Sequence, residues 1–154
     1  INRGISGQTT PQMLVRFRAD VINLKPKAVI ILAGTNDIAG NTPFRNLETV
    51  LGHLSSMAEL ASQNEIKVIM CSILPAADYP WRSGKNPDIQ IPLLNKMIKD
   101  YSQKNGFYYL DYFSSMTNSN SGLKKEYGND GVHPNISGYR LMSEMLLKAL
   151  KEVL

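Results

Sequence analysis

The chain has 154 residues, of which 43% are hydrophobic and 19% charged, a composition typical of one soluble globular domain. Its net charge of +4 comes from 17 basic and 13 acidic residues scattered along the chain, so we expect a solvated surface and no nucleic-acid partner. No apolar run approaches the ~18 residues of a membrane span, and the single cysteine, Cys71, excludes an intrachain disulfide.

The first predicted element is a helix over residues 11–24, preceded by a glycine-containing loop at residues 2–7. Residues 28–33 then form an apolar run rich in β-branched side chains, which indicates a strand buried on both faces, as in a parallel sheet. The strand leads into residues 34–37, Gly-Thr-Asn-Asp, and open α/β sheets bind ligands beyond such strand ends. Asn36 is therefore a candidate amide donor, or alternatively a turn residue that bonds its own backbone.

A long helix is predicted over residues 43–65, because apolar side chains recur there at helical spacing. His53 lies off the apolar stripe, so we expect it to be a surface residue without a functional role. Residues 67–74 form a second buried strand, in which Cys71 is most simply a small core residue.

The loop over residues 75–92 follows this second strand, so it should overhang the same face as Asn36. It holds Tyr79, Trp81 and Arg82, which suit a substrate wall for a sugar or an aryl group. The alternative is that the tryptophan plugs the loop onto the domain.

The rest of the chain continues the alternation of helix and strand. We predict a helix over residues 91–105 with Leu93 on its apolar face, a strand over 107–112, and a last helix from 134 or 137 to 153 with Tyr139 pointing inward. The alternation predicts an α/β fold in which helices cover both faces of a parallel sheet, within a single domain spanning residues 1–154.

Residues 130–134, Asp-Gly-Val-His-Pro, place a carboxylate three residues before an imidazole. Asp130 can accept a hydrogen bond from one ring nitrogen of His133, which fixes the tautomer and leaves the other nitrogen free to act as a base. Gly131 permits the tight turn between them, and Pro134 suits the first position of the following helix. On geometry alone, the motif is equally compatible with an ordinary loop histidine.

Taken together, residues 2–7 (Asn-Arg-Gly-Ile-Ser-Gly), 34–37 and 130–134 occur in the order, context and approximate spacing of the SGNH hydrolases, also called GDSL esterases. The chain resembles this family over essentially its whole length. The resemblance implies a three-layer α/β/α sandwich with a flavodoxin-like parallel sheet, and serine ester hydrolysis without a metal or organic cofactor.

The resemblance also assigns roles to particular positions. It implies that the Gly7 backbone N–H and the Asn36 amide stabilise an oxyanion, that His133 is the general base and that Asp130 orients it. The residue types suit this chemistry, because an oxyanion needs donors without bulk and the base must take a proton and later return it.

The family pattern begins with a Gly-Asp-Ser block that carries the nucleophile, and this chain has no such block. No serine present replaces it convincingly. We therefore expect an N-terminally incomplete domain whose first two strands are absent, with the nucleophile upstream of Ile1 or on a separate N-terminal fragment. The strand at residues 28–33 would then become an apolar edge, which invites aggregation.

Two classes of function follow. The first is a carboxylic-ester hydrolase acting on small acyl groups, such as acetyl on a carbohydrate or other alcohol, or else a lysophospholipase-like acylhydrolase. The second is a catalytically inactive relative that binds a carbohydrate or a protein partner. Because members of this family are often exported, the resemblance favours a secreted or periplasmic location, although no signal region is visible in the sequence.

Overall fold

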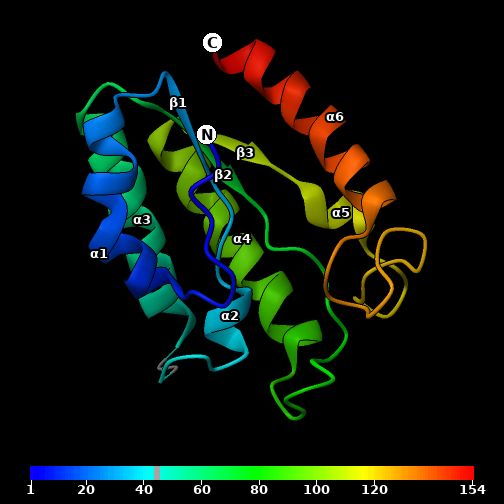
Figure 1. Ribbon diagram of the computed structural model, residues 1–154. Helices are drawn as coiled ribbons and strands as arrows, with labels where there is room; N and C mark the ends of the chain where they lie inside the picture. Colours follow the sequence, from blue (N-terminus) through cyan, green and yellow to red (C-terminus); the bar gives the residue numbers. More distant parts are fainter. Residues whose placement is uncertain (44–45) are drawn as a thin grey trace.

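The computed structural model describes residues 1–43 and 46–154, and its described strands form one parallel sheet in the order β1-β2-β3 (Figure 1). These strands are β1 (Ala28–Ile31), β2 (Lys67–Cys71) and β3 (Tyr108–Leu110). β2 lies in the middle, with Val68 opposite Val29 of β1 and Ile69 opposite Tyr108 of β3. The carboxyl ends of parallel strands meet at one edge of the sheet, so the segments that follow them gather there.

Helices cover both faces of this sheet (Figure 1). One face carries α1 (Thr10–Asp20), α3 (Leu47–Gln63) and α4 (Pro87–Asn105), and the other carries α5 (Tyr112–Met116) and α6 (Ile136–Val153). The short elements η1 (Ile22–Leu24) and α2 (Thr35–Ile38) lie before and after β1. The predicted α/β/α fold with a parallel sheet is therefore confirmed.

The helix ends follow from local side-chain chemistry. The Thr9 backbone N–H donates to Gln12 Oε1 at 2.9 Å, and Asn46 and Asn135 accept backbone N–H groups at the starts of α3 and α6. Such bonds satisfy donors that have no partner within the first turn of a helix. Gly106 ends α4 with a φ of 70°, a left-handed conformation that glycine adopts without steric cost.

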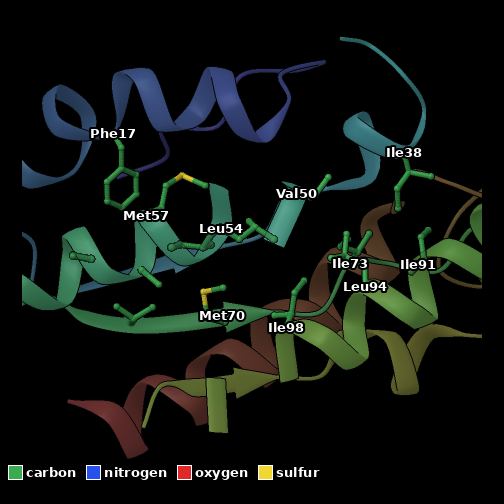
Figure 2. Packing of buried hydrophobic residues seen from close by; sticks show 14 of the residues in the cluster. Phe17, Ile38, Val50, Leu54, Met57, Met70, Ile73, Ile91, Leu94 and Ile98 are labelled. Carbon is green, nitrogen blue, oxygen red and sulfur yellow. The ribbon is translucent and has the colours of Figure 1, made fainter. Parts of the chain in front are cut away.

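Alternate residues of β2 serve different hydrophobic cores. Val68 and Met70 pack with α1, α3 and α4, whereas Ile69 and Cys71 pack with α5 and α6. Figure 2 shows the first core, in which Met57 of α3 points toward Phe17 of α1, and Met57 and Leu54 are each at most 1% exposed. Burying an apolar side chain of this size stabilises the fold by about 1.5–3 kcal/mol.

β1 forms an edge of the sheet, and only one of its faces is well covered. Ile31 points into the first core, but Ile30 and Leu32 remain 39% and 36% exposed. A groove of about 490 Å³ runs along this edge between residues 1–4, α1 and β1. β1 thus presents apolar surface of the kind expected for an unpaired edge strand.

The structure corrects several details of the predicted elements. The third predicted helix begins at Pro87 instead of about residue 91, and its stripe of Ile91, Leu94 and Ile98 leaves Leu93 53% exposed. Tyr139 is 58% exposed, because it lines a surface hollow beside Asn129 and Ile136 instead of packing inward. The long helix begins at Leu47, and the first part of the range predicted for it includes residues 44–45, which lie outside the described residues.

Candidate active site

Asp130 and His133 form a compact hydrogen-bonded pair on the loop that precedes α6. Asp130 Oδ2 lies 2.7 Å from His133 Nδ1, while Oδ1 accepts the backbone N–H groups of Val132 at 2.9 Å and His133 at 2.8 Å. Gly131 lies between them with a φ of 80°, where a side chain would be strained. The bonds from His133 and Val132 lower the pKa of Asp130 to about 2.

This geometry determines what the imidazole can do. Because the ionised carboxylate only accepts hydrogen bonds, Nδ1 of His133 carries the hydrogen and donates it to Asp130. Nε2 of the neutral ring then has a free lone pair, and the side chain is 69% exposed. The pair can therefore take a proton from a group that approaches from solvent.

The chain around the pair is held by backbone bonds. Gly128 forms an isolated antiparallel bridge with Pro134, and the Asn135 N–H donates to the Tyr127 carbonyl at 2.8 Å. The Asn135 side chain both donates to the Glu126 carbonyl and accepts from Gly138 N–H, so it joins the loop to the first turn of α6. The loop and the start of α6 therefore form one supported unit.

Gly7 and Asn36 lie on two segments of the chain that are joined by hydrogen bonds. Asn36 Nδ2 donates to the Gln8 carbonyl at 2.9 Å, and Asn41 Nδ2 donates to the Gly7 carbonyl at 2.9 Å. One amide hydrogen of Asn36 thus has no partner among the described residues, and neither does the Gly7 N–H. Both donors are available to a negatively charged oxygen.

The loop after β2 contacts both the His133 ring and the chain directly after α2, the helix that carries Asn36. The Trp81 ring stacks against the His133 ring, with centroids 5.6 Å apart and an angle of 27° between their planes. The next residue, Arg82, donates from Nη1 to the carbonyls of Ala39 at 3.0 Å and Gly40 at 2.5 Å, directly after α2. The loop therefore reaches from the imidazole to the helix that carries Asn36.

Of the three side chains predicted on this loop, Trp81 is 52% exposed and Tyr79 is fully buried. The Tyr79 hydroxyl lies 2.8 Å from Thr35 Oγ1, and burial raises its pKa to about 12. The structure thus brings Trp81 to the surface beside His133, while Tyr79 lies beneath it, with ring centroids 5.6 Å apart, and Arg82 holds the loop to α2.

Comparison with known proteins now identifies the family. Residues 1–141 match the model of the GDSL-like Lipase/Acylhydrolase family. The chain belongs to this family. A GDSL-like lipase from Bacteroides thetaiotaomicron VPI-5482, known as a crystal structure, is 46% identical with a TM-score of 0.97, and the match covers 100% of this chain and 76% of that one.

Two curated relatives of this GDSL-type chain carry names that state an activity. An acetylxylan esterase from Xylanibacter ruminicola is 26% identical over 176 residues, covering 97% of this chain and 35% of that protein. A multidomain esterase from Ruminococcus flavefaciens is 30% identical over 128 residues, covering 82% of this chain and 16% of that protein. The chain spans about a third or less of the length of these curated relatives.

Two further features bear on the chemistry of this GDSL-type site. Within residues 1–43 and 46–154, no serine or threonine hydroxyl forms a hydrogen bond with the ring of His133. The same residues contain no group of three or more side chains suited to hold a metal ion. Their helices include none with both the length and the hydropathy of a membrane span.

Two contacts near Gly7 and Asn36 could not be expected from the sequence. The sequence indicates no role for Asn41, whose amide donates to the Gly7 carbonyl. It indicates a surface position for His53, but His53 Nδ1 lies 3.0 Å from the hydroxyl of the buried Thr10. His53 is partly buried, so it is not the fully exposed surface residue that the sequence pattern indicates. The one available signal was that Asp37, the partner of Thr10, belongs to the Gly-Thr-Asn-Asp motif.

Proposed function

We propose that this protein is a serine carboxylic-ester hydrolase that removes small acyl groups, acetyl in particular, from a carbohydrate or another alcohol. The observation that carries the proposal is the Asp130–His133 pair, whose exposed ring has a free Nε2 and stacks on Trp81. The family and the names of the esterase relatives support the same class of reaction.

In the proposed reaction, His133 Nε2 takes the proton of a serine hydroxyl as the serine oxygen attacks the acyl carbon. The carbonyl oxygen becomes negatively charged and is stabilised by the Gly7 N–H and the free amide hydrogen of Asn36. When the intermediate collapses, the alcohol leaves with the proton from His133. Water then hydrolyses the acyl-serine by the same steps, releasing a carboxylic acid and restoring the serine.

We infer that the serine comes from a segment upstream of Ile1, either within the same polypeptide or as a separate fragment. Three observations support this inference: His133 has no hydroxyl partner among the described residues, β1 has an open apolar edge, and the Bacteroides lipase is longer than its match with this chain. The domain would then be incomplete at its N-terminus.

The choice of a small acyl group rests on where the apolar space lies. None of the residues that line the groove along β1 is Gly7, Asn36 or His133, so this groove does not extend the site for a long acyl chain. A second hollow, on the segment that follows His133, is lined by Asn129, Asn135 and Tyr139 among others, and these polar side chains suit the hydroxyl groups of a sugar. Trp81 offers an apolar ring surface stacked on the imidazole.

The test uses the protein expressed from its complete gene. Treatment with a fluorophosphonate followed by peptide mass spectrometry should label one serine upstream of Ile1, and p-nitrophenyl acetate and acetylated xylo-oligosaccharides should be hydrolysed faster than a lysophospholipid. His133→Asn is the matched variant, because its amide retains a donor to Asp130 at the position of Nδ1 but has no atom that replaces Nε2. We expect this variant to lose both labelling and turnover.

Each other outcome contradicts part of the proposal. Faster hydrolysis of the lysophospholipid would replace the acetyl-ester assignment by the lysophospholipase-like one. Labelling of a serine within residues 1–154 would show that the nucleophile has been misplaced. No labelling and no turnover of any ester would favour the inactive binding module, for which binding of xylo-oligosaccharides could then be measured by calorimetry.

For the location, we retain the proposal that the protein is secreted or periplasmic. A Bacillus subtilis relative that is 36% identical over 78 residues is named as an uncharacterized lipoprotein, YqeF, and the match covers 49% of this chain and 32% of that protein. Fractionation of cells that express the complete gene would test this.

A further inference from the structure

A series of hydrogen bonds joins α1, α2 and α3 close to the segments that carry Gly7 and Asn36. Asp37 of α2 is 4% exposed, and its two carboxylate oxygens accept the backbone N–H of Thr10 at 3.1 and 3.0 Å. Asp37 Oδ1 also accepts the Thr10 hydroxyl at 2.6 Å. On the far side of that hydroxyl, His53 Nδ1 of α3 lies 3.0 Å from Thr10 Oγ1.

The direction of the hydrogen bonds follows from counting hydrogens. The Thr10 hydroxyl has one hydrogen, and the 2.6 Å distance to Asp37 is typical of a hydroxyl that donates to a carboxylate. That hydrogen is therefore not available for His53, so His53 Nδ1 must donate to Thr10 Oγ1. The structure accordingly requires the hydrogen on Nδ1 of His53.

The position of this chain relates it to the oxyanion donors. Thr10 is the first residue of α1 and follows the segment that carries Gly7, while Asp37 follows Asn36 directly. A carboxylate at the N-terminus of a helix is favoured by the helix dipole and by the free N–H groups there. Asp37 thus ties the two segments together on the buried side, and the bonds from Asn36 and Asn41 tie them together on the exposed side.

The charge state of Asp37 matters for this tie. Burial raises the pKa of Asp37, whereas the hydrogen bonds from Thr10 and the proximity of His53 act in the opposite direction. An ionised carboxylate accepts both bonds from Thr10, but a protonated one would have less capacity to accept. The two donors of Thr10, its N–H and its hydroxyl, therefore favour the form of Asp37 that holds the two segments together.

We propose that His53 and Thr10 are positioning residues of the oxyanion hole, which hold the Gly7 segment against Asn36 through the buried carboxylate of Asp37. The part of this proposal that concerns the oxyanion hole rests on the proposed esterase function. The hydrogen-bonded tie itself does not, because it is a property of the folded chain. The two can therefore be tested separately.

The kinetic test uses the protein from its complete gene and p-nitrophenyl acetate. Thr10→Val, which retains the shape but not the hydroxyl, should lower kcat by about 10–100-fold with KM changed less than about twofold, because displacement of a catalytic group by about 1 Å can cost 10²-fold. His53→Leu should lower kcat by about 3–10-fold, because Thr10 can still donate to Asp37 without it.

Conservative variants distinguish positioning from general packing. His53→Asn places an amide N–H at the position of Nδ1, and Thr10→Ser keeps the hydroxyl, so both should recover most of the lost kcat. Ser56→Ala is the matched control on α3, because among the described residues the Ser56 hydroxyl bonds only to the Gly52 carbonyl of its own helix. Equal losses in His53→Leu and His53→Asn, or wild-type kcat in His53→Leu, would overturn the proposal.

A second measurement does not depend on turnover. Nitrogen-15 NMR of the ring nitrogens, assigned with His53→Asn, should show the hydrogen of His53 on Nδ1. The N–H of Thr10 donates to Asp37. Its hydrogen exchange should therefore accelerate by about tenfold in His53→Leu, which loosens Thr10. A His53 hydrogen on Nε2 in place of Nδ1, or unchanged amide exchange at Thr10, would refute the hydrogen-bonded link between His53, Thr10 and Asp37 even if the protein is an active esterase. An inactive wild-type protein with the expected NMR and exchange results would refute only the proposed esterase function.

Discussion

Replacing Gly128 by alanine should destabilise the loop that carries Asp130 and His133, although Gly128 has no unusual backbone conformation. The added Cβ would overlap with Leu123 Cδ2 and lie 2.7 Å from the carbonyl oxygen of His133. Gly128 and Pro134 form the bridge that closes this loop. The position therefore requires glycine because the backbone at His133 approaches it closely.

The cost can be worked from these contacts. The contact with the His133 carbonyl is roughly 0.6 Å shorter than the ~3.3 Å at which a carbon normally approaches a carbonyl oxygen. Leu123 is 3% exposed, so its side chain can move away only by disturbing the core beneath it. Overpacking of this kind costs about 1–3 kcal/mol in the free energy of unfolding. The displacement of His133 should also lower kcat at least ~10-fold.

Guanidinium unfolding of Gly128→Ala beside Gly52→Ala measures this directly. Gly52 lies within α3, and nothing lies within 4 Å of the position its Cβ would take, so the same added methyl should stabilise the protein by about 0.5–1 kcal/mol. The two variants should thus change stability in opposite directions. A Gly128→Ala protein that unfolds at the same denaturant concentration as wild type and keeps its kcat would refute this reasoning.

Further predictions concern the site and its core. Gly131→Ala should cost about 1–2 kcal/mol through backbone strain alone, since its φ is 80° and no atom lies within 4 Å of the added methyl. Asp130→Asn should lower kcat by about 10⁴-fold, as the comparable substitution does in a serine protease, because an amide opposite His133 Nδ1 forces the hydrogen onto Nε2. The carboxyl of Asp130, followed by carbon-13 NMR, should titrate near pH 2; because its folded pKa lies below the ordinary value of 3.8, its stabilising contribution is complete above about pH 4 and is lost as the pH falls toward 2. Cys71, whose pKa burial raises to about 12, should react with iodoacetamide only after unfolding.

These predictions fail in distinguishable ways. Normal stability in Gly131→Ala would mean that the turn relaxes to another conformation, and retained turnover in Asp130→Asn would remove the carboxylate from the proposed mechanism. A titration midpoint of Asp130 near 3.8 would contradict the observed bonds to Val132 and His133. Fast labelling of native Cys71 would show that β2 opens more readily than its packing implies.

The sequence predicts well what depends on nearby residues. The Asp130–His133 pair spans three residues and needs only the turn at Gly131, so its residue pattern allows the observed bond to be anticipated as one of two alternatives. The buried strands are likewise visible as apolar runs. The short helices α2 and α5 were missed, because four or five residues are too few to show helical periodicity and their turn-forming residues resemble loops.

Contacts between distant residues could not be predicted in the same way. Trp81 and His133 are far apart in sequence, and the choice between a substrate wall and a plug depended on where the loop docks. The bond between His53 and Thr10 joins helices whose relative rotation is set by side-chain packing, such as that of Phe17 against α3. A histidine beside a glycine on the polar side of a helix gives no local sign of such a partner.

The double use of β2 has a consequence for how the protein unfolds. Met70 belongs to one core, and Ile69 and Cys71 belong to the other. If either helical layer detached, one face of β2 would expose its apolar side chains to water, and the other layer would lose the support of an intact strand. Separate melting of the two halves would thus be penalised, and both should be lost in a single cooperative transition. The amides of β2 should be the last to exchange with deuterium, at the rate of global unfolding.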